Sequence, residues 1–326
     1  MSAKPKVLVS RKIPEPAVEL LAQHCQLDRN REDRPLPRKE LLKRVAGCDG
    51  LVCLLLDKID EELLSAAPRL KVVSNVAVGF DNIDLAAATR RKVMATNTPE
   101  VLTDTTADFA FTLLISAARR VAEADRYVRA GKFKEWGIDL LLGQDVHHAT
   151  LGILGMGRIG TGLARRARGF EMRVIYYDDF RAKPEIEKEF GLEFKDKDTV
   201  LREADFLSLH VPLLPTTRHL ISRRELGLMK KTAILVNTSR GPVVDEEALA
   251  EALKSGRIGG AGLDVFEFEP KVHPDLLRLD NVVLAPHIAS APGATRTRMA
   301  VMAAENCLAA LAGRTPPNLL NKDLAK

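Results

Sequence analysis

Residues 150–178 read TLGILGMGRIGTGLARRARGFEMRVIYYD, and this stretch decides the fold. Its first apolar run, residues 151–154, is typical of a buried strand, and a second run at 174–177 ends in Asp178. Between the two runs, a glycine-rich turn passes into a segment with apolar residues at three- and four-residue steps, which favours a helix. The stretch therefore predicts a strand, a glycine turn, a helix and a second strand.

Three glycines in this turn, Gly155, Gly157 and Gly160, have the spacing of a dinucleotide-binding motif. In such a site the first glycine forms the tight turn, the second lets the backbone approach a pyrophosphate, and the third lets helix and strand pack closely. The phosphates then lie at the N-terminus of the helix that begins near Arg158. Asp178 follows Gly160 by eighteen residues, close to the spacing of about 20 expected for a carboxylate that binds ribose hydroxyls. Glycine-rich turns also occur for purely structural reasons. Here a strand precedes the turn, a helix follows it, and Asp178 ends the next strand, and together these features favour a dinucleotide site.

The composition limits the possible classes of protein. The chain has 326 residues, enough for about two domains, and 46% of them are hydrophobic and 29% charged, as in a globular protein. Its 49 basic and 44 acidic residues are interleaved, which argues against a nucleic-acid-binding surface, while the net charge of +5 favours small anionic substrates. No apolar run near the start is long enough for a signal peptide or a membrane span, so we expect a cytoplasmic protein. The four cysteines lack the spacing of a zinc site or a disulfide framework, and we expect buried reduced thiols and no metal.

Outside the central stretch, apolar runs alternate with helical patterns, as in the βα units that build parallel sheets. Strands are expected at 7–9, 51–56, 72–78 and 93–96, and then at 206–210, 234–237, 262–266 and 282–284. Helices are expected between them, with one long helix at about 104–130 and a last one at 294–311. The sequence therefore predicts an α/β protein with two doubly wound parallel sheets.

Three segments at strand ends in the second half carry polar residues, among them Arg240, Glu269 and His287. Because the carboxyl ends of parallel strands meet at one edge of a sheet, we expect these side chains to converge where the glycine turn also points. Each has an ordinary alternative when taken singly: a surface ion pair for the arginine, a solvated loop acid for the glutamate, and a hydrogen-bonded core residue for the histidine. Their joint arrival at the cofactor edge favours a catalytic site.

These residue types suit hydride chemistry at a 2-keto acid. The planar guanidinium of Arg240 can bind a carboxylate through two hydrogen bonds. His287 can donate a proton to the developing alkoxide, and an anionic Glu269 beside it would favour the protonated ring and orient it. A nicotinamide would supply the hydride, and the protein would supply position and electrostatics.

Five motifs in order make the whole chain resemble the D-2-hydroxyacid dehydrogenases, most closely their glyoxylate/hydroxypyruvate reductase branch. The motifs are TPEVLTDTTADFAFTLL, GILGMGRIG, VNTSRGPVVDEEAL, AGLDVFEFEP and APHIAS. The resemblance implies that Arg240, Glu269 and His287 are catalytic. It also implies two Rossmann-like domains with the active site in the cleft between them: a flavodoxin-like substrate-binding domain of residues 1–100 plus 290–326, and a dinucleotide-binding domain of residues 101–289.

The same resemblance assigns further site residues. Those implied to bind the cofactor are Gly155, Gly157, Arg158, Ile159, Gly160, Asp178, Val211, Pro212, Thr238, Asp264 and Thr106. Those implied to bind the substrate are Leu54, Val78, Gly79, Arg240 and Trp136, with Val78 and Gly79 offering backbone N–H groups to the substrate carboxylate. In the hydroxypyruvate reductase branch, a tryptophan matching Trp136 reaches the partner subunit's active site, so a homodimer is expected.

The expected activity is NAD(H)-dependent reduction of glyoxylate or hydroxypyruvate to the D-2-hydroxy acid. NADH is expected to be preferred to NADPH, because Asp178 and Asp179 would repel a 2′-phosphate. Arg181 could weaken that discrimination, but we expect it to pair with one of the two acids. The alternatives are 2-ketogluconate reductase or phosphite dehydrogenase on the same scaffold, or an NAD-sensing protein resembling the C-terminal binding corepressors.

Overall fold

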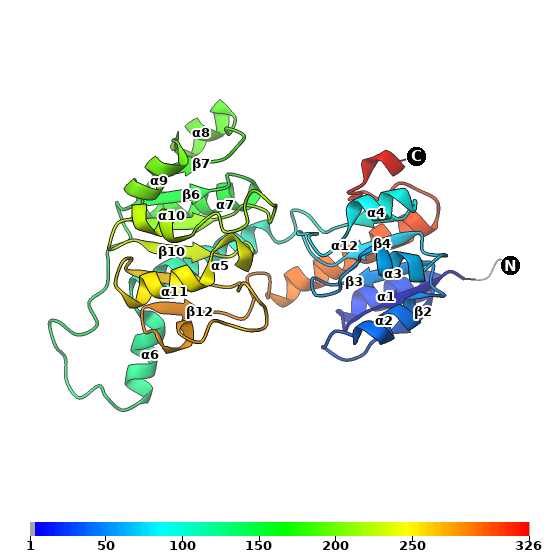
Figure 1. Ribbon diagram of the computed structural model, residues 1–326, viewed down its shortest axis with the longest axis horizontal. Coiled ribbons are helices and arrows are strands. Elements are labelled where there is room, and N and C mark those ends of the chain that lie inside the picture. Colours follow the sequence, from blue (N-terminus) through cyan, green and yellow to red (C-terminus); the bar gives the residue numbers. More distant parts are fainter. Residues whose placement is uncertain (1–3, 326) are drawn as a thin grey trace. The chain divides into compact units, whose positions relative to one another are not determined.

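The computed structural model describes residues 4–325. The chain forms two compact units, one of Met1–Leu102 with Ala291–Lys326, and the other of Thr103–Ser290 (Figure 1). Each unit is a parallel sheet covered by helices on both faces, as the alternating βα pattern predicts.

The first unit holds a five-stranded sheet with the strand order β2-β1-β3-β4-β5, and every paired strand is parallel. Its strands are β1 (Lys6–Val9), β2 (Gln26–Arg29), β3 (Gly50–Cys53), β4 (Val72–Asn75) and β5 (Met94–Thr96). Its helices are α1 (Glu15–His24), α2 (Arg38–Val45), α3 (Glu61–Ala66), α4 (Leu85–Arg90) and α12 (Gly293–Leu311), with a short 3-10 turn, η4 (Lys322–Leu324).

Two apolar cores cover the two faces of this sheet, because successive strand residues point to opposite sides. On β1, Leu8 packs with α2, α3 and α4, whereas Val7 and Val9 pack with α1 and α12. The C-terminal helix α12 thus lies on the sheet built by the N-terminal residues.

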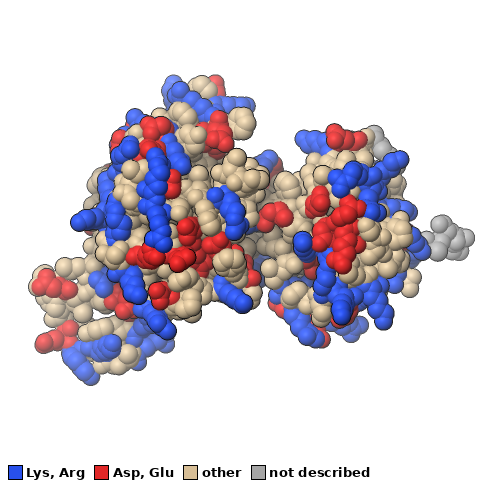
Figure 2. Space-filling view, in the orientation of Figure 1, with Lys and Arg blue, Asp and Glu red and all other residues tan. Residues whose placement is uncertain are grey.

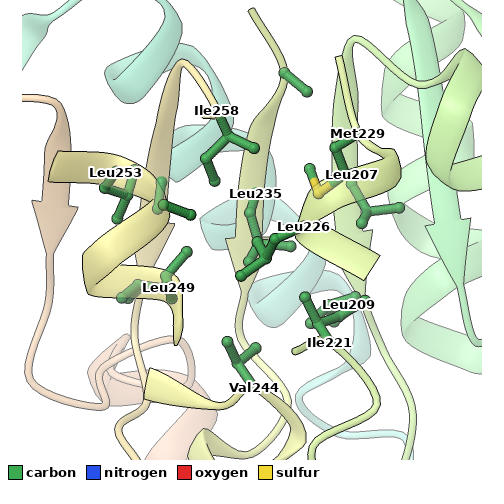
Figure 3. Close-up of a cluster of buried hydrophobic side chains, with 14 of the residues drawn as sticks. Leu207, Leu209, Ile221, Leu226, Met229, Leu235, Val244, Leu249, Leu253 and Ile258 are labelled. Carbon is green, nitrogen blue, oxygen red and sulfur yellow. The ribbon is translucent and has the colours of Figure 1, made fainter. Parts of the chain in front are cut away.

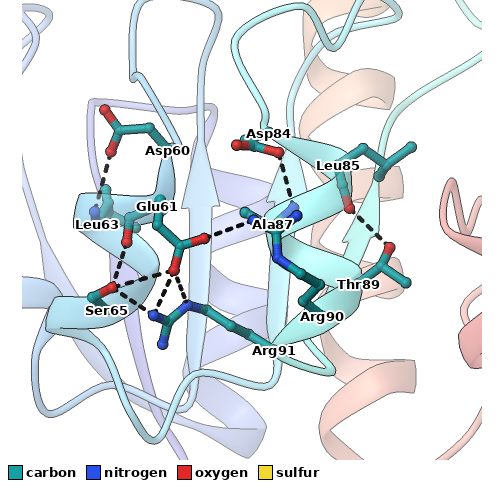
Figure 4. Close-up of polar contacts among 10 residues, drawn as sticks. All are labelled: Asp60, Glu61, Leu63, Ser65, Asp84, Leu85, Ala87, Thr89, Arg90 and Arg91. Carbon is teal, nitrogen blue, oxygen red and sulfur yellow. Dashed lines mark hydrogen bonds and ion pairs between the residues drawn. The ribbon is translucent and has the colours of Figure 1, made fainter.

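Carboxylates fix the start of two short helices in this unit (Figure 4). The Asp60 side chain accepts a hydrogen bond from the N–H of Leu63 at the start of α3, and Asp84 does the same for Ala87 at the start of α4. Such caps satisfy N–H groups that a helix leaves unpaired, and each stabilises its helix by about 1 kcal/mol. Glu61 of α3 also binds Arg91 after α4, which joins the two helices.

The second unit holds a seven-stranded parallel sheet with the order β12-β11-β10-β9-β6-β7-β8. Its strands are β6 (Thr150–Leu154), β7 (Arg173–Tyr177), β8 (Leu192–Phe194), β9 (Phe206–Leu209), β10 (Ile234–Asn237), β11 (Gly260–Leu263) and β12 (Val282–Leu284). Its α-helices are α5 (Thr103–Ala118), α6 (Val121–Arg129), α7 (Arg158–Ala167), α8 (Pro184–Phe190), α9 (Lys197–Glu203), α10 (Arg223–Leu228) and α11 (Glu246–Lys254). Three 3-10 turns complete it: η1 (Arg168–Phe170), η2 (Gly241–Val243) and η3 (Leu276–Arg278).

One face of this sheet packs against α9, α10 and α11, and the other packs against α5 and α7. On the first face, Leu207, Leu209 and Leu235 of the central strands meet apolar residues of the helices, including Leu226 and Leu249 (Figure 3). Leu235 is wholly buried, and truncating such a leucine to alanine typically costs about 2–5 kcal/mol of stability. The strand ends that carry the site therefore stand on a rigid support.

Two strands, β2 and β8, are missing from the elements predicted from sequence. Both are edge strands, and β2 has no fully buried residue. Edge strands are short and carry charged residues, so they lack the apolar run from which a buried strand is recognised. Each predicted sheet is therefore one strand too small, but its parallel type is predicted correctly.

The single long helix predicted at 104–130 is wrong, because the structure has two helices, α5 and α6, in its place. Arg120 between them has a left-handed backbone with φ 52°, which ends the first helix. Its guanidinium binds Glu123, and the carbonyl of Ala118 accepts the N–H of Gln144. Val121 at the start of α6 is 50% exposed. Gly131 follows α6 with φ 67°, a left-handed conformation in which glycine commonly ends a helix.

Acidic and basic side chains are interspersed over the face of the molecule in Figure 2, in agreement with a mixed, solvated surface. All four cysteines, Cys25, Cys48, Cys53 and Cys307, are buried and free, as predicted. Across residues 4–325, no helix is both long enough and apolar enough to cross a membrane.

Candidate active site

Strand register in the second unit brings the glycine turn and the acid to the same edge. β6 lies between β7 and β9, with Leu154 opposite Tyr177 on one side and Leu209 on the other. The next residues on these three strands are Gly155, Asp178 and His210. They all leave the sheet at its carboxyl edge, at the point where strand order reverses, which is where parallel α/β sheets bind ligands.

The structure gives each glycine of the turn a separate physical role. Gly155 has φ +96°, and a Cβ there would lie 2.7 Å from the backbone of His210. A Cβ at Gly160 would collide with the carbonyl oxygen of Gly155, so α7 could not pack this closely on β6. A Cβ at Gly157 would meet no described atom within 4 Å, and Gly157 and Arg158 are exposed at the start of α7. The turn thus leaves open backbone at a helix N-terminus, as a bound pyrophosphate requires.

Asp178 is held by the turn that it faces. Its carboxylate accepts the N–H of Met156 at 2.7 Å and the N–H of Phe180 at 3.0 Å. Arg181 was expected to pair with Asp178 or Asp179, and that expectation is wrong: it forms a two-pronged ion pair with Glu187 and lies over the Phe194 ring. The arginine is engaged, but by α8 rather than by the strand-end acids.

The remaining residues assigned to the cofactor lie around the same edge. Ile159 follows Arg158 in the first turn of α7, and Val211 and Pro212 follow β9. Thr238 follows β10, and its buried hydroxyl has no hydrogen-bond partner in the part of the chain described. A buried hydroxyl without a partner is costly, and a bound amide or ribose could satisfy it. Thr106 is buried in the first turn of α5.

The open glycine turn, the strand-end acid and the unpartnered hydroxyl form a donor and acceptor set that fits a nicotinamide dinucleotide. Each of these features lies in the unit of Thr103–Ser290, on the carboxyl side of its sheet. Gly155, Gly157, Asp178 and Thr238 are the residues that would hold it.

The loop that carries Arg240 is organised by Asn237 at the end of β10. Its amide oxygen accepts the N–H and the hydroxyl of Ser239, and its amide nitrogen donates to the Arg240 carbonyl at 3.0 Å. A Cβ at the next residue, Gly241, would collide with the Phe266 carbonyl. The arginine loop and the loop after β11 are therefore in backbone contact, which only glycine permits.

Glu269 and His287 form a hydrogen-bonded pair. The distance between His287 Nδ1 and Glu269 Oε2 is 2.9 Å, and the side chains are 30% and 24% exposed, respectively. The other carboxylate oxygen of Glu269 accepts the N–H of Phe266 at 3.1 Å. Burial acts to raise the pKa of Glu269, but the His287 hydrogen bond and charge, the Phe266 N–H and the Arg240 charge together hold this pKa below its ordinary value. Glu269 is therefore an anion beside the imidazole, and the Arg240 charge also favours its ionised form.

Asp264 supports the histidine through its backbone. Its side-chain oxygens accept the N–H groups of Ile288 at 2.7 Å and Ala289 at 2.8 Å, and its carbonyl accepts the N–H of His287. His287 has φ 54°, a left-handed conformation that the surrounding contacts must maintain. Burial raises the pKa of Asp264, although the two N–H groups oppose this. The sequence assigned Asp264 to the cofactor, and its visible role is to fix the histidine loop.

Leu54, Val78 and Gly79 lie in the other unit, at the carboxyl ends of β3 and β4. The Val78 carbonyl accepts the side-chain amide of Asn97 at 2.7 Å, and the Gly79 carbonyl accepts that of Asn75 at 3.0 Å. Since C=O and N–H point in opposite directions across a trans peptide, fixing the Val78 carbonyl also fixes the N–H of Gly79. The Ala77 carbonyl, which accepts the N–H of Thr98 at 2.8 Å, fixes the N–H of Val78 in the same way.

Trp136 lies in the irregular segment after α6, and its side chain is among the most exposed large apolar groups described, at 75%. Figure 1 shows this segment beyond α6, extending away from the seven-stranded sheet. The Trp136 side chain is therefore not packed into its own unit.

Sequence reasoning named Asp264 only for the cofactor and missed the supporting role that it shares with Asn237, and it also missed His210. Asn237 and Asp264 both end strands, and a polar residue at that position is the signal that could have shown their bracing roles. His210 also ends a strand, its ring lies 2.9 Å from the Ser208 hydroxyl, and burial lowers its pKa to about 4. No spacing or motif distinguishes a histidine that stays neutral from one that donates a proton.

Comparison with known proteins shows the family of this chain. Residues 111–289, more than half of the chain, match the D-isomer specific 2-hydroxyacid dehydrogenase, NAD binding domain. A glyoxylate reductase of Korarchaeum cryptofilum (strain OPF8) is 56% identical over 326 residues, spanning 99% of this chain and 98% of that relative.

Solved structures agree as well. A protein of Thermus thermophilus has a TM-score of 0.89 and 45% identity, covering 97% of this chain and 99% of that one. The NADPH-dependent glyoxylate/hydroxypyruvate reductase of Sinorhizobium meliloti, solved with NADP and malonate, has a TM-score of 0.88 and 30% identity, with 99% of both chains covered. The matched domain binds a nicotinamide cofactor, and the fold is that of its relatives. The chain is an enzyme that belongs to the D-isomer specific 2-hydroxyacid dehydrogenase family.

Proposed function

We propose that this enzyme uses NADH to reduce glyoxylate or hydroxypyruvate, with His287 as the proton donor. The observation that carries the proposal is the 2.9 Å hydrogen bond between His287 Nδ1 and the Glu269 carboxylate. It leaves Nε2 as the ring nitrogen that can give a proton to a substrate oxygen. The glyoxylate reductase relative at 56% identity supports the choice of keto acid.

A bound dihydronicotinamide supplies the hydride. The protonated His287 gives its Nε2 proton to the carbonyl oxygen as negative charge develops there, and Glu269 stabilises the imidazolium before transfer. Arg240 binds the substrate carboxylate and carbonyl, which orients the reacting carbon and polarises the C=O bond. The N–H groups of Val78 and Gly79 bind the same carboxylate, with Leu54 beside them. Support for this last role is that neither N–H donates to a described residue.

NADH is the proposed cofactor. Asp178 is fixed at the end of β7 by two N–H groups, so its carboxylate cannot easily turn away from a 2′-phosphate. Arg181, the nearest cation in sequence that could bind such a phosphate, is held by Glu187 at 2.9 Å. The Sinorhizobium meliloti relative is NADPH-dependent, so the family itself does not decide the matter.

A homodimer is the proposed assembly, with Trp136 reaching the site of the second copy. Helix α6 has no buried residue, and in Figure 1 it extends with its following loop away from the seven-stranded sheet. Large apolar side chains along this arm are exposed: Val121, Val128, Phe133, Trp136, Ile138 and Leu142. An apolar stretch of this extent is typical of a surface that another chain covers.

The test is a substrate panel of glyoxylate, hydroxypyruvate, pyruvate, 2-ketogluconate and phosphite, with NADH or NAD, read by absorbance at about 340 nm, where the reduced nicotinamide absorbs. We expect the highest kcat/KM with glyoxylate or hydroxypyruvate and NADH. A highest value with 2-ketogluconate or phosphite would move the chain to another activity of the scaffold. No turnover with any pair, together with tight NADH binding, would favour an NAD-sensing protein.

A further inference from the structure

We propose that Glu246 is a positioning residue that holds the loop of the catalytic glutamate, an inference that rests on the proposed function. Glu246 is the first residue of α11 and is only 7% exposed, yet it lies outside the reacting groups. Its two carboxylate oxygens bind the two ends of one loop. Oε2 accepts the N–H of Glu267 at 2.7 Å, and Oε1 accepts the N–H of His273 at 2.6 Å.

The loop that Glu246 spans, residues 267–273, contains Glu269. None of these seven residues is buried, and Phe268 beside Glu269 is 67% exposed. Val272 near one end packs against the apolar core, but the part of the loop around Glu269 has no buried apolar side chain, so its position depends largely on hydrogen bonds. A bond to an ionised group is stronger than one between neutral groups, so the Glu246 carboxylate provides the best available anchor.

The contact between the helix and the loop is reciprocal. While Glu246 accepts the N–H of Glu267, the Glu267 side chain accepts the N–H of Glu246 at 3.4 Å. Glu267 is further held by His219 Nε2 at 2.7 Å and by Arg218 at 3.2 Å. Between the two anchored ends, the N–H of Lys271 donates to the Phe268 carbonyl at 2.9 Å, which closes a tight turn around Glu269.

The same chain segment carries both the arginine and the anchor. Arg240 begins it, Gly241 contacts the Phe266 backbone, and Glu246 ends it at the start of α11. The distance between the Glu269 carboxylate and the His287 ring is therefore set from one side by Asp264, which holds the histidine loop, and from the other by Glu246. Loss of the Glu246 anchor should lengthen the Glu269–His287 bond while leaving the cofactor edge at β6 and β7 unchanged.

The test is Glu246→Gln, with Glu247→Gln as its control. A glutamine can accept from only one of the two N–H groups, and its own NH₂ would face the other donor. Glu247 is the next residue of α11, is exposed, and loses the same charge in its variant. We expect Glu246→Gln to lower kcat for hydroxypyruvate about 10- to 100-fold, the range that a small misplacement of a catalytic group produces. KM for NADH should stay unchanged, and Glu247→Gln should behave as the wild type.

A double variant separates positioning from general support. If Glu246 acts through Glu269, then adding Glu246→Gln to Glu269→Gln should change kcat by less than about twofold, because coupled residues are not additive. The alkaline limb of the kcat profile should also move to lower pH in Glu246→Gln, as in Glu269→Gln. The inference would be overturned if Glu246→Gln lowered kcat by the same factor in the wild type and in Glu269→Gln. It would also be overturned if the alkaline limb of the kcat profile stayed in place in Glu246→Gln, or if kcat itself were unchanged in that variant.

Two further measurements cover a failure of folding or of the activity itself. If Glu246→Gln does not bind NADH, the second variant is Glu246→Asp, whose side chain keeps the charge but is too short to span both N–H groups. We expect Glu246→Asp to show the same loss of kcat. A wild-type kcat in Glu246→Asp would overturn the inference. If the wild type oxidises no NADH with either keto acid, the proposed function fails, and amide hydrogen exchange tests the anchor alone. Faster exchange across residues 267–273 in Glu246→Gln than in Glu247→Gln supports it, and equal exchange overturns it.

Discussion

Nδ1 of His287 lies 2.9 Å from Oε2 of Glu269, and this contact joins a residue in left-handed backbone geometry to a residue in a loop that has no buried residue. Neither residue is placed by its own secondary structure. Both depend on carboxylates elsewhere, Asp264 for the histidine and Glu246 for the glutamate. The reactive pair is therefore only as well aligned as the hydrogen bonds that brace it.

Replacing the proposed proton donor should abolish most turnover. In His287→Ala no group remains to protonate the alkoxide, and kcat should fall about 10²- to 10⁴-fold, the usual contribution of a general acid. The NADH dissociation constant, measured by fluorescence, should change little because the glycine turn is untouched. A kcat within about threefold of the wild type would show that another group or water gives the proton.

The role of Glu269 should appear in the pH dependence of reduction. Glu269 carries a lowered pKa, held down by His287, Phe266 and Arg240 against the effect of burial, so it remains anionic throughout the neutral range. An anion beside a general acid favours the protonated form of that acid, so the loss of the anion should be visible in the pH dependence of the rate. The alkaline limb of kcat in Glu269→Gln should therefore move to lower pH. A limb at the wild-type position would remove Glu269 from this role.

Cofactor choice should follow the charge of Asp178. Asp178→Asn keeps an oxygen that can accept the Met156 N–H but removes the negative charge, so NADPH should bind better by on the order of tenfold while NADH binds more weakly. Asp179→Asn should shift the preference in the same direction, because Asp179 is the second acid expected to repel a 2′-phosphate. Equal kcat/KM for NADH and NADPH in the wild type would mean that a cation other than the engaged Arg181 governs this pocket.

The exposed arm should be tested by oligomeric state and by substrate affinity. Trp136→Ala should raise KM for the keto acid about tenfold, as expected for a large aromatic contact. Ile138→Ala is a matched control, since Ile138 is 73% exposed in the same segment against 75% for Trp136. Light scattering at the assay concentration should give twice the chain mass. A monomer with full activity would contradict the role of Trp136 in a second copy.

His210 should make the enzyme sensitive to mild acid. Burial lowers its pKa to about 4, so between pH 6.5 and 4 the unfolded chain binds a proton that the folded chain does not, and stability falls as pH falls. At about 1.4 kcal/mol per pKa unit, this one group removes up to about 3 kcal/mol of unfolding free energy across that window. Urea unfolding at several pH values should show a shallower loss in His210→Gln. Parallel curves for both proteins would show that His210 is not the group responsible.

The central part of the fold could be predicted because its strands are buried on both faces and read as apolar runs. Residues 150–178 supplied a strand, turn, helix and strand that the structure confirms as β6, α7 and β7. The edge strands β2 and β8 could not be found this way, because half-exposed strands carry charged residues. The break at Arg120 was also invisible, since no glycine or proline marks it and long-range contacts stabilise it.

The positions of the proposed reactive groups could be predicted more readily than the residues that support them. Arg240, Glu269 and His287 end or follow strands whose carboxyl ends must meet, so topology alone brings them together. The partner of Arg181 was not predictable, because α8 places Glu187 beside it only after folding. The same holds for Asp264 and Glu246, whose carboxylates bind backbone N–H groups of loops distant in sequence.

The most direct test of the account is the reduction of hydroxypyruvate by NADH, with the configuration of the product determined. We expect NADH oxidation that yields D-glycerate in the wild type and that falls at least about 100-fold in His287→Ala. Formation of L-glycerate, or equal rates in the wild type and His287→Ala, would contradict it.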